Sequence, residues 1–228
     1  MKVDKELTYL MRRISEGERI EDPWPSIHAT DIFTDEFYNR MLDNFPPKEE
    51  FEQCKDFSYE RYRLPIGRDY EKYDIVWKEL SEILTSPELK HYLLSQFKIP
   101  RVNLEKTCTS YPQLVRDVAG YKIYPHPDSS AKLLTFTMYM PRDKSRPDIG
   151  MWINEWGKKV DLFNRAEYTL ENYPKVRQIP YIPNSCVIFP VSKYSFHSVD
   201  FCNIDDYQRK SLHNIYYYDN AVTDGWTE

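Results

Sequence analysis

The sequence predicts a mostly β protein, a barrel or jelly-roll sandwich of short strands with N-terminal helices packed outside it. Apolar residues in the first hundred positions recur at three- and four-residue spacings, which is typical of helices. After Pro100 the chain changes to short β-rich segments broken by Pro, Asn, Asp and Gly. Helices followed by about eight short strands are typical of such a fold. We therefore expect residues 1–100 to be a helical extension packed on a core of residues 101–228, in one structural unit.

The first hundred residues are expected to contain three helical regions, because apolar residues line one face of each. Residues 48–69 are charged and aromatic without a clear period, so we expect a loop there. In order, the expected elements are a helix at residues 2–18, a short extended piece at 27–32, a helix with Thr34 as its N-cap that ends before Pro46, and helical residues 73–97 interrupted near Ser86 and Pro87.

The second half reads as a series of strands with turns between them. Sixteen prolines in the chain imply many turns and strand edges. The expected strands are VNLEKTCTS (102–110), YKIYPH (121–126), LLTFTMYM (133–140), GMWIN (150–154), KKVDLF (158–163), VRQIPYI (176–182), SCVIFPV (185–191), SFHSVDF (195–201) and KSLHNIYYYD (210–219).

Composition and charge exclude several classes of protein. The net charge of −5 and the lack of a basic cluster argue against nucleic acid as the main partner, because phosphate binding needs concentrated Lys and Arg. No apolar run approaches the roughly 20 residues of a membrane span, and the charged start MKVDKELTYLMRR does not resemble a signal peptide. The four cysteines form no CxxC pair, which favours free thiols in a reducing cytoplasm. We therefore expect a cytoplasmic protein without a membrane partner.

A possible metal site begins at His126 and Asp128, which are separated by Pro127 at the end of an expected strand. Side chains in extended backbone repeat every two residues, so both point to one side. Chance alone gives roughly one such pair in this chain, and a surface turn with Asp128 capping its own backbone is the alternative. His197 begins a later strand. Two histidines and a carboxylate form the facial triad of non-haem Fe(II) oxygenases, although a core histidine bonded to a backbone carbonyl is also consistent with His197.

A possible carboxylate anchor lies on the last expected strand. Arg209, Ser211 and His213 share one face at period two. A guanidinium and a hydroxyl aimed into a barrel match a carboxylate on a small ligand, because Arg supplies a bidentate fork and Ser an extra donor. The alternative is an edge-strand arginine that faces solvent.

The order HPD…H…RxS on these strands resembles the 2-oxoglutarate- and Fe(II)-dependent oxygenases, close to the branch of prolyl-hydroxylase-like and small tailoring hydroxylases. The likeness covers about residues 22 to 218. Its motifs are specific in combination, although each is weak alone. The stretches that carry it are YKIYPHPDSSAKLLTFTMYMP, NSCVIFPVSKYSFHSV and RKSLHNIYYY, with DPWPSIHATDIFTDEFYNRMLDNFP as a lead-in.

The resemblance implies a double-stranded β-helix and a set of roles. His126, Asp128 and His197 would bind Fe(II) and serve catalysis, and Arg209, assisted by Ser211, would pair with the distal carboxylate of 2-oxoglutarate. Reaction with O2 would yield succinate and CO2 and hydroxylate an unactivated C–H bond. The chain departs from the family pattern at Pro127, where many relatives have Thr. It departs again at Gly150 and Met151, where relatives often have a GT pair, which puts family-based inferences about the substrate wall in doubt.

Further candidates rest on position alone. Tyr124, two residues before His126, is expected to line the cofactor pocket. Arg116 is a candidate for an anionic substrate, with a surface ion pair as the alternative. Lys132 is a candidate for a second carboxylate contact, although its place just after the turn favours solvent. The remaining candidates are Trp152 and Trp156 as an aromatic substrate wall or as core, His213 as a less favoured rival to His197, and His28 and His91 as structural residues.

Three functions follow from these residues. The first is a 2-oxoglutarate-dependent hydroxylase of a small molecule, a sugar or an amino-acid-like substrate. The second is a peptide or protein hydroxylase of the same fold, for which residues 48–70 and 142–178 are long enough to form a groove or lid. The third is a cupin-like metal- or sugar-binding barrel without oxygenase activity. The proposed anchor and the low glycine content, 6 residues, argue against the third.

Overall fold

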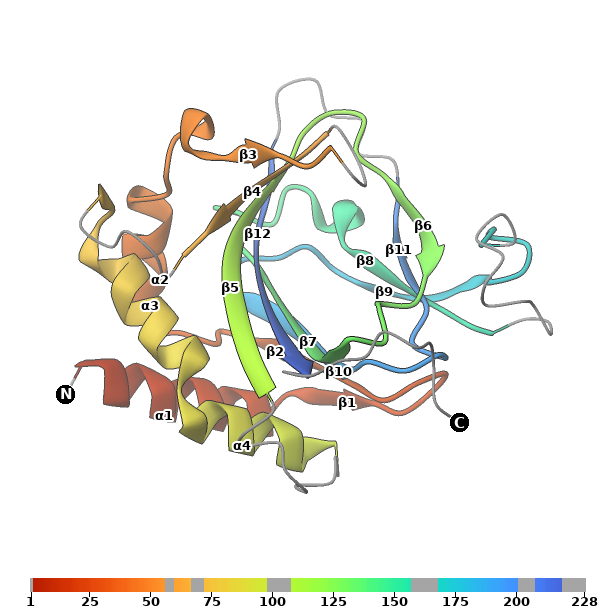
Figure 1. Ribbon diagram of the computed structural model, residues 1–228, viewed down its shortest axis with the longest axis horizontal. Helices are drawn as coiled ribbons and strands as arrows, with labels where there is room; N and C mark the ends of the chain where they lie inside the picture. Colours follow the sequence, from red (N-terminus) through yellow and green to blue (C-terminus); the bar gives the residue numbers. More distant parts are fainter. Residues whose placement is uncertain are drawn as a thin grey trace.

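Two antiparallel sheets face each other in the computed structural model, which describes residues 2–55, 60–66, 72–97, 108–156, 168–200 and 208–218 (Figure 1). Within these residues no strand pairing joins the two sheets, so the fold is a jelly roll and not a closed barrel. The larger sheet has the order β1 (Glu18–Ile20), β2 (Ser26–Thr30), β10 (Ser185–Pro190), β7 (Lys132–Tyr139), β12 (Arg209–Tyr218), β5 (Cys108–Asp117), β4 (Arg61–Pro65) and β3 (Glu52–Gln53). The smaller has the order β6 (Ile123–His126), β11 (His197–Val199), β8 (Met151–Asn154) and β9 (Lys175–Ile179).

The helices lie together on one side of the larger sheet (Figure 1). They are α1 (Lys2–Ser15), α2 (Asp35–Asp43), α3 (Ile75–Thr85) and α4 (Pro87–Gln96), and two short 3₁₀ turns, η1 (Lys48–Glu50) and η3 (Pro147–Ile149), complete the described helical elements. The expected N-cap is confirmed: the Thr34 hydroxyl accepts from the backbone N–H of Phe37 at 3.3 Å. The expected interruption near Ser86 is also confirmed, because Ser86 caps α4. None of the described helices is long and apolar enough to cross a membrane.

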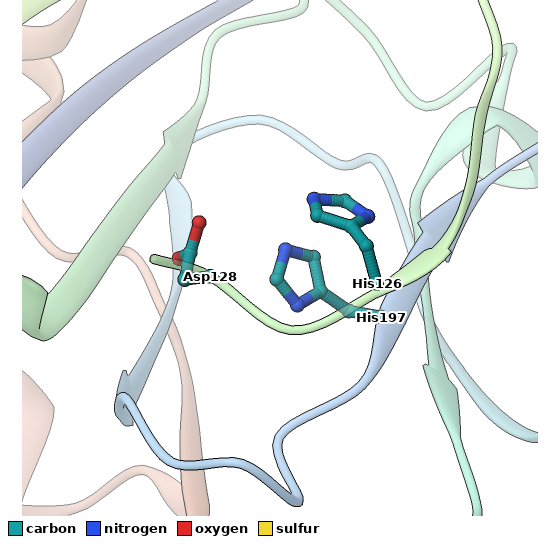
Figure 2. Close-up of side chains that lie close together, drawn as sticks. All are labelled: His126, Asp128 and His197. Atoms are coloured by element: carbon teal, nitrogen blue, oxygen red, sulfur yellow. The ribbon is translucent and has the colours of Figure 1, made fainter. Parts of the chain in front are cut away.

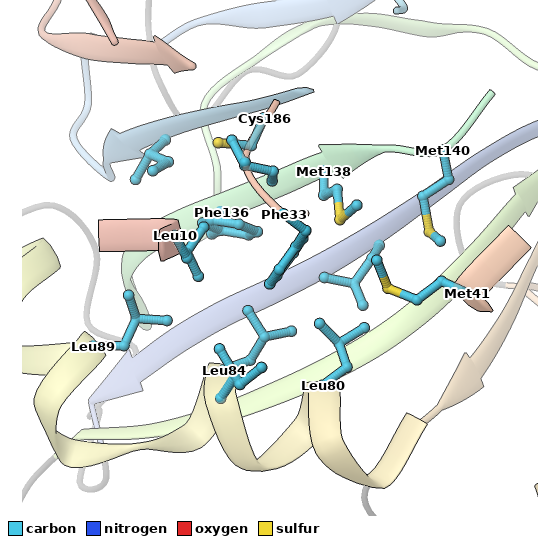
Figure 3. Close-up of a cluster of buried hydrophobic side chains, with 14 of the residues drawn as sticks. Leu10, Phe33, Met41, Leu80, Leu84, Leu89, Phe136, Met138, Met140 and Cys186 are labelled. Carbon is cyan, nitrogen blue, oxygen red and sulfur yellow. The ribbon is translucent and has the colours of Figure 1, made fainter. Parts of the chain in front are cut away.

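Strand β7 shows how the larger sheet separates core from site. Phe136 and Met138 point toward the helices and join Leu80 and Leu84 of α3 in a buried apolar cluster (Figure 3). Thr135 and Tyr139 alternate with them and face the interior between the sheets. In that interior Tyr139 belongs to a second apolar cluster, whose other members include Met151, Ile153, Val187, Phe189 and Val199 from both sheets.

Three expectations about the elements of the chain need correction. Residues 48–69, expected to be loop, contain η1, β3 and β4, and β4 pairs with β5 through Arg61 and Asp117. The sequence of β4 lacks the apolar alternation that marks a strand, because its interior positions hold arginines. Strand β5 runs to Asp117, seven residues beyond the expected end. Because β1 to β4 are strands of the larger sheet, the first hundred residues are not purely a helical extension. The strand expected at 158–163 lies outside the described residues.

Candidate metal centre

Three side chains with metal-binding atoms meet where β6, β11 and the turn before β7 come together (Figure 2). His126 ends β6 and is opposite His197, the first residue of β11. Asp128 follows in the turn. Their ligand atoms lie within 4.8 Å of one another, and the two imidazole rings have centroids 4.5 Å apart. The structure thus brings together the three residues that the sequence singled out for a metal.

Both histidines have one ring nitrogen held by a backbone carbonyl. His126 Nδ1 lies 2.8 Å from the carbonyl oxygen of Tyr124, and His197 Nδ1 lies 3.0 Å from that of Ser195. A carbonyl only accepts, so each Nδ1 carries the proton and each Nε2 keeps a lone pair. Burial, and then the nearby His197 ring, lowers the pKa of His126 to about 3, and burial also lowers the pKa of His197. Neutral imidazoles with free Nε2 lone pairs are the form that ligates a metal.

Asp128 supplies the negative charge of the group. Burial acts to raise its pKa, but Lys132 and the two histidines outweigh burial and hold the pKa well below its ordinary value. One carboxylate oxygen accepts from the Lys132 ammonium at 2.5 Å, and the other accepts from the Thr135 hydroxyl at 2.7 Å. Lys132 therefore pairs with Asp128, and the expectation that it faces solvent is wrong.

The donor set fits Fe(II). Two neutral imidazole nitrogens and one ionised carboxylate match the facial triad, which leaves the opposite side of the metal for other ligands. Cys186, a soft ligand that would favour other metals, is buried in the apolar cluster beneath the helices and does not reach the group. The fit of these residues to Fe(II) thus rests on their chemistry and on the nitrogen that each ring presents.

Arg209 and Ser211 are buried in the interior on β12, so the alternative of a solvent-facing edge arginine is wrong. Arg209 donates from Nε to the carbonyl oxygen of Ile149 at 2.8 Å and from Nη1 to Asp117 at 2.7 Å. Its guanidinium carbon lies 5.2 Å from the ring centroid of Tyr139. The guanidinium, the Tyr139 hydroxyl and the Ser211 hydroxyl therefore belong to one end of the interior.

Three residues near Arg209 were not predicted from the sequence. Tyr139 lies four residues after Thr135 on the same face of β7, and its hydroxyl accepts from the backbone N–H of Met151 at 3.0 Å. Because side chains alternate along a strand, this spacing could have identified Tyr139 from the sequence. Arg61 and Asp117 gave no such signal, because their meeting depends on the pairing of β4 with β5.

His213 lies on the Arg209 face of β12, with Nε2 3.2 Å from the Ser211 hydroxyl. Burial, followed by the neighbouring Arg61 and Arg209, lowers its pKa well below the ordinary value. It does not belong to the group of metal-binding side chains, which agrees with the preference for His197.

Tyr124 is not in the interior. It is 59 % exposed, and its hydroxyl accepts from Lys122 at 3.1 Å. The pairing of β6 with β11 shifts register between His126 and Ile123, so the two-residue alternation is broken there. The expectation that Tyr124 lines the cofactor pocket is therefore corrected.

Arg116 and Trp152 also lie away from the interior. Arg116 is buried on the helix-facing side of β5, where its guanidinium carbon lies 4.9 Å from the Phe45 ring and 4.8 Å from the Phe51 ring. Trp152 donates from Nε1 to Asp200 at 2.8 Å, while its neighbours on β8, Met151 and Ile153, fill the interior. Neither side chain faces the interior that holds the metal group. Trp156 packs among Tyr173, Tyr194 and Phe196, as a core residue would.

No family model matches the sequence, and no curated protein matches it. The fold, however, is similar to that of several solved structures. HygX from Streptomyces hygroscopicus, with nickel and 2-oxoglutarate bound, has a TM-score of 0.54 at 11 % identity, over 87 % of this chain and 84 % of that chain. The epimerase SnoN, in complex with Fe3+, alpha ketoglutarate and nogalamycin RO, has a TM-score of 0.52 at 12 % identity, over 94 % of this chain and 84 % of that chain.

A prolyl hydroxylase from Trichoplax adhaerens, in complex with a hypoxia inducible factor peptide fragment, has a TM-score of 0.53 at 12 % identity, over 96 % of this chain and 91 % of that chain. Identities this low establish the fold alone. The chain therefore has the double-stranded β-helix fold of the 2-oxoglutarate- and Fe(II)-dependent oxygenases, as its motifs predicted.

Proposed function

We propose that this chain is an Fe(II)- and 2-oxoglutarate-dependent oxygenase that hydroxylates an unactivated C–H bond of a small molecule, a sugar or an amino-acid-like substrate. One observation carries the proposal: His126, Asp128 and His197 meet in a fold of this class, with both Nδ1 atoms bonded to backbone carbonyls. Bound Fe(II) and 2-oxoglutarate would supply oxidation by O2, with succinate and CO2 as co-products.

The residues around the triad hold its charge and orientation. The carbonyls of Tyr124 and Ser195 keep the imidazole protons on Nδ1, so that Nε2 of each ring would be the atom that binds a metal. The Thr135 hydroxyl fixes one oxygen of Asp128. Lys132 pairs with the other oxygen and would balance the carboxylate charge before metal binding. Outer groups of this kind raise the affinity of a site, because the ligands need not reorient.

At the other end of the interior, Arg209 would bind the distal carboxylate of 2-oxoglutarate, helped by the hydroxyls of Tyr139 and Ser211. Arg209 shares the one carboxylate of Asp117 with Arg61, and its planar fork matches a further carboxylate. The buried Arg209 is the feature that disfavours a cupin-like barrel without oxygenase activity, since such a barrel has no use for an arginine there.

Apolar side chains close much of the interior around this site. Phe189 lies 5.1 Å, ring centroid to ring centroid, from His197, and Ile153 and Val199 belong to the same buried cluster. Apolar walls exclude water, which protects a reactive centre from side reactions. A small substrate is supported by HygX and SnoN, whose structures contain hygromycin B and nogalamycin RO. A peptide substrate is the alternative, since the similar prolyl hydroxylase holds a peptide. The reduced thiol of Cys186, buried in the apolar cluster beneath the helices, supports a reducing, cytoplasmic location.

The test is turnover of 2-oxoglutarate. Purified protein is loaded with Fe(II) without oxygen, exposed to O2, and assayed for succinate. We expect Fe(II)-dependent succinate formation that a candidate substrate stimulates. Absence of turnover, together with absence of thermal stabilisation by 2-oxoglutarate, contradicts the proposal. Stimulation by peptides but not by small molecules would assign the chain to the peptide alternative.

A further inference from the structure

A row of three charged side chains crosses the interior on adjacent strands of the larger sheet. Arg61 on β4 is opposite Asp117 on β5, and Asp117 is opposite Arg209 on β12. All three side chains are buried, with 8 %, 1 % and 2 % of the surface of each residue exposed, in that order. We propose that Asp117 and Arg61 are positioning residues, which fix the Arg209 guanidinium for the distal carboxylate of a 2-oxo dicarboxylic acid. The proposal rests on the function proposed above.

The contacts explain how one carboxylate can orient two guanidinium groups. Arg61 binds Asp117 with both prongs, Nε to Oδ1 at 2.7 Å and Nη2 to Oδ2 at 3.0 Å. Arg209 Nη1 donates to the same Oδ2 at 2.7 Å. A bidentate pair fixes the carboxylate plane, so Asp117 can act as a rigid support for Arg209. The Arg61 guanidinium is itself held over the ring of Tyr121, 4.3 Å from its centroid.

A second contact fixes the plane of Arg209. Its Nε donates to the carbonyl oxygen of Ile149, just before Gly150. Gly150 allows this segment to pack closely against the end of β9, because a Cβ there would lie 1.8 Å from the carbonyl oxygen of Ile179. With Nε held by Ile149 and Nη1 by Asp117, the guanidinium cannot rotate without breaking a buried hydrogen bond.

The charge of the row suits one carboxylate. Two guanidinium groups share the single carboxylate of Asp117, so a further carboxylate would be attracted to this buried place. A monocarboxylic 2-oxo acid would bring no such second carboxylate. Arg61 would therefore contribute to the preference for a dicarboxylic acid without touching it.

Charge and position predict opposite effects at Asp117. If Asp117 acts only by neutralising Arg209, then Asp117→Asn raises the local positive charge and tightens the binding of 2-oxoglutarate. If it positions Arg209, the same substitution weakens binding. Asp117→Glu keeps the charge but moves the carboxylate by one methylene, so it also weakens binding under the positioning role and has no effect under a purely electrostatic one.

The experiment compares two ligands on the full chain loaded with Mn(II), which accepts carboxylate ligands such as Asp128 and avoids turnover. Dissociation constants are measured by calorimetry for 2-oxoglutarate and for 2-oxopentanoate, which has the same chain length but ends in a methyl group. Their ratio reports on recognition of the distal carboxylate. Loss of structure alone weakens both ligands and leaves the ratio unchanged. Arg116→Met, which removes a buried arginine from the other face of β5, is the matched control.

We expect Asp117→Asn, Asp117→Glu and Arg61→Met each to reduce the preference for 2-oxoglutarate at least about tenfold. Arg61→Lys should restore part of the preference. Arg116→Met should show the same preference as the unsubstituted chain, and the Mn(II) affinity of the variants should stay unchanged. An unchanged or increased preference in Asp117→Asn or Asp117→Glu overturns the inference. If the unsubstituted chain binds Mn(II) but shows no preference for 2-oxoglutarate, the proposed function fails first, and the two failures are thus distinct.

Discussion

The two faces of the larger sheet differ in chemistry although they alternate along the same strands. Toward the helices, β7 presents Phe136 and Met138, which pack among leucines (Figure 3). Toward the interior, the same strand presents Thr135, which bonds a ligand of the metal centre, and Tyr139, which lies beside Arg209. The helix-facing side chains hold the strand in register, and this register places the interior side chains. Substitutions on the two faces should therefore separate stability from chemistry.

The largest effect is expected from removing a metal ligand. His197→Ala deletes one of the two Nε2 donors, so Fe(II) affinity and succinate formation should fall at least about a hundredfold, while the protein stays folded. Metal titration and the succinate assay measure the loss, and circular dichroism checks the fold. His91→Ala, on α4, is the control. Full activity in His197→Ala would exclude it as a ligand.

A helix-facing substitution should do the reverse. Phe136→Ala leaves a cavity in the buried cluster beneath the helices and should lower the free energy of unfolding by about 3–5 kcal/mol. Urea denaturation measures this loss, and the folded fraction at low temperature should keep its Mn(II) affinity. Ile75→Ala is the control, because Ile75 is 54 % exposed. A loss of Mn(II) affinity without a loss of stability would mean that the two faces are not separable.

The smallest effect is expected from an outer hydrogen bond of the metal centre. Thr135→Val keeps the shape of the side chain but removes the hydroxyl that holds Asp128, and Mn(II) affinity should fall by about 10- to 100-fold. Thr135→Ser retains the hydroxyl and should bind Mn(II) as the unsubstituted chain does. Equal affinities for Thr135→Val and Thr135→Ser would show that this bond does not orient the carboxylate.

The metal-binding residues could be predicted from the sequence because the prediction depends on residue spacing along single strands. His126 and Asp128 lie two residues apart, His197 follows the apolar strand β10 after a short turn, and Arg209 begins the largely apolar strand β12. The prediction for Tyr124 failed because the two-residue alternation is broken there. The register shift beside His126 turns Tyr124 outward.

Other features depend on which strands become neighbours. The apolar period that marks most strands is absent from β4, where Arg61 faces the interior, so its pairing with β5 could not be foreseen. The direction of Arg116 could not be foreseen either. It is the residue before Asp117, and the alternation of β5 sends one toward the helices and the other toward the interior.

The central claim is that His126, Asp128 and His197 form a metal site whose rings present Nε2. Anomalous diffraction from crystals grown with Mn(II) and 2-oxoglutarate tests it most directly. The account predicts one strong peak bonded to Nε2 of His126, Nε2 of His197 and a carboxylate oxygen of Asp128, with the distal carboxylate of 2-oxoglutarate on Arg209. A peak at another group of residues, or ligation through Nδ1 of either histidine, would contradict it.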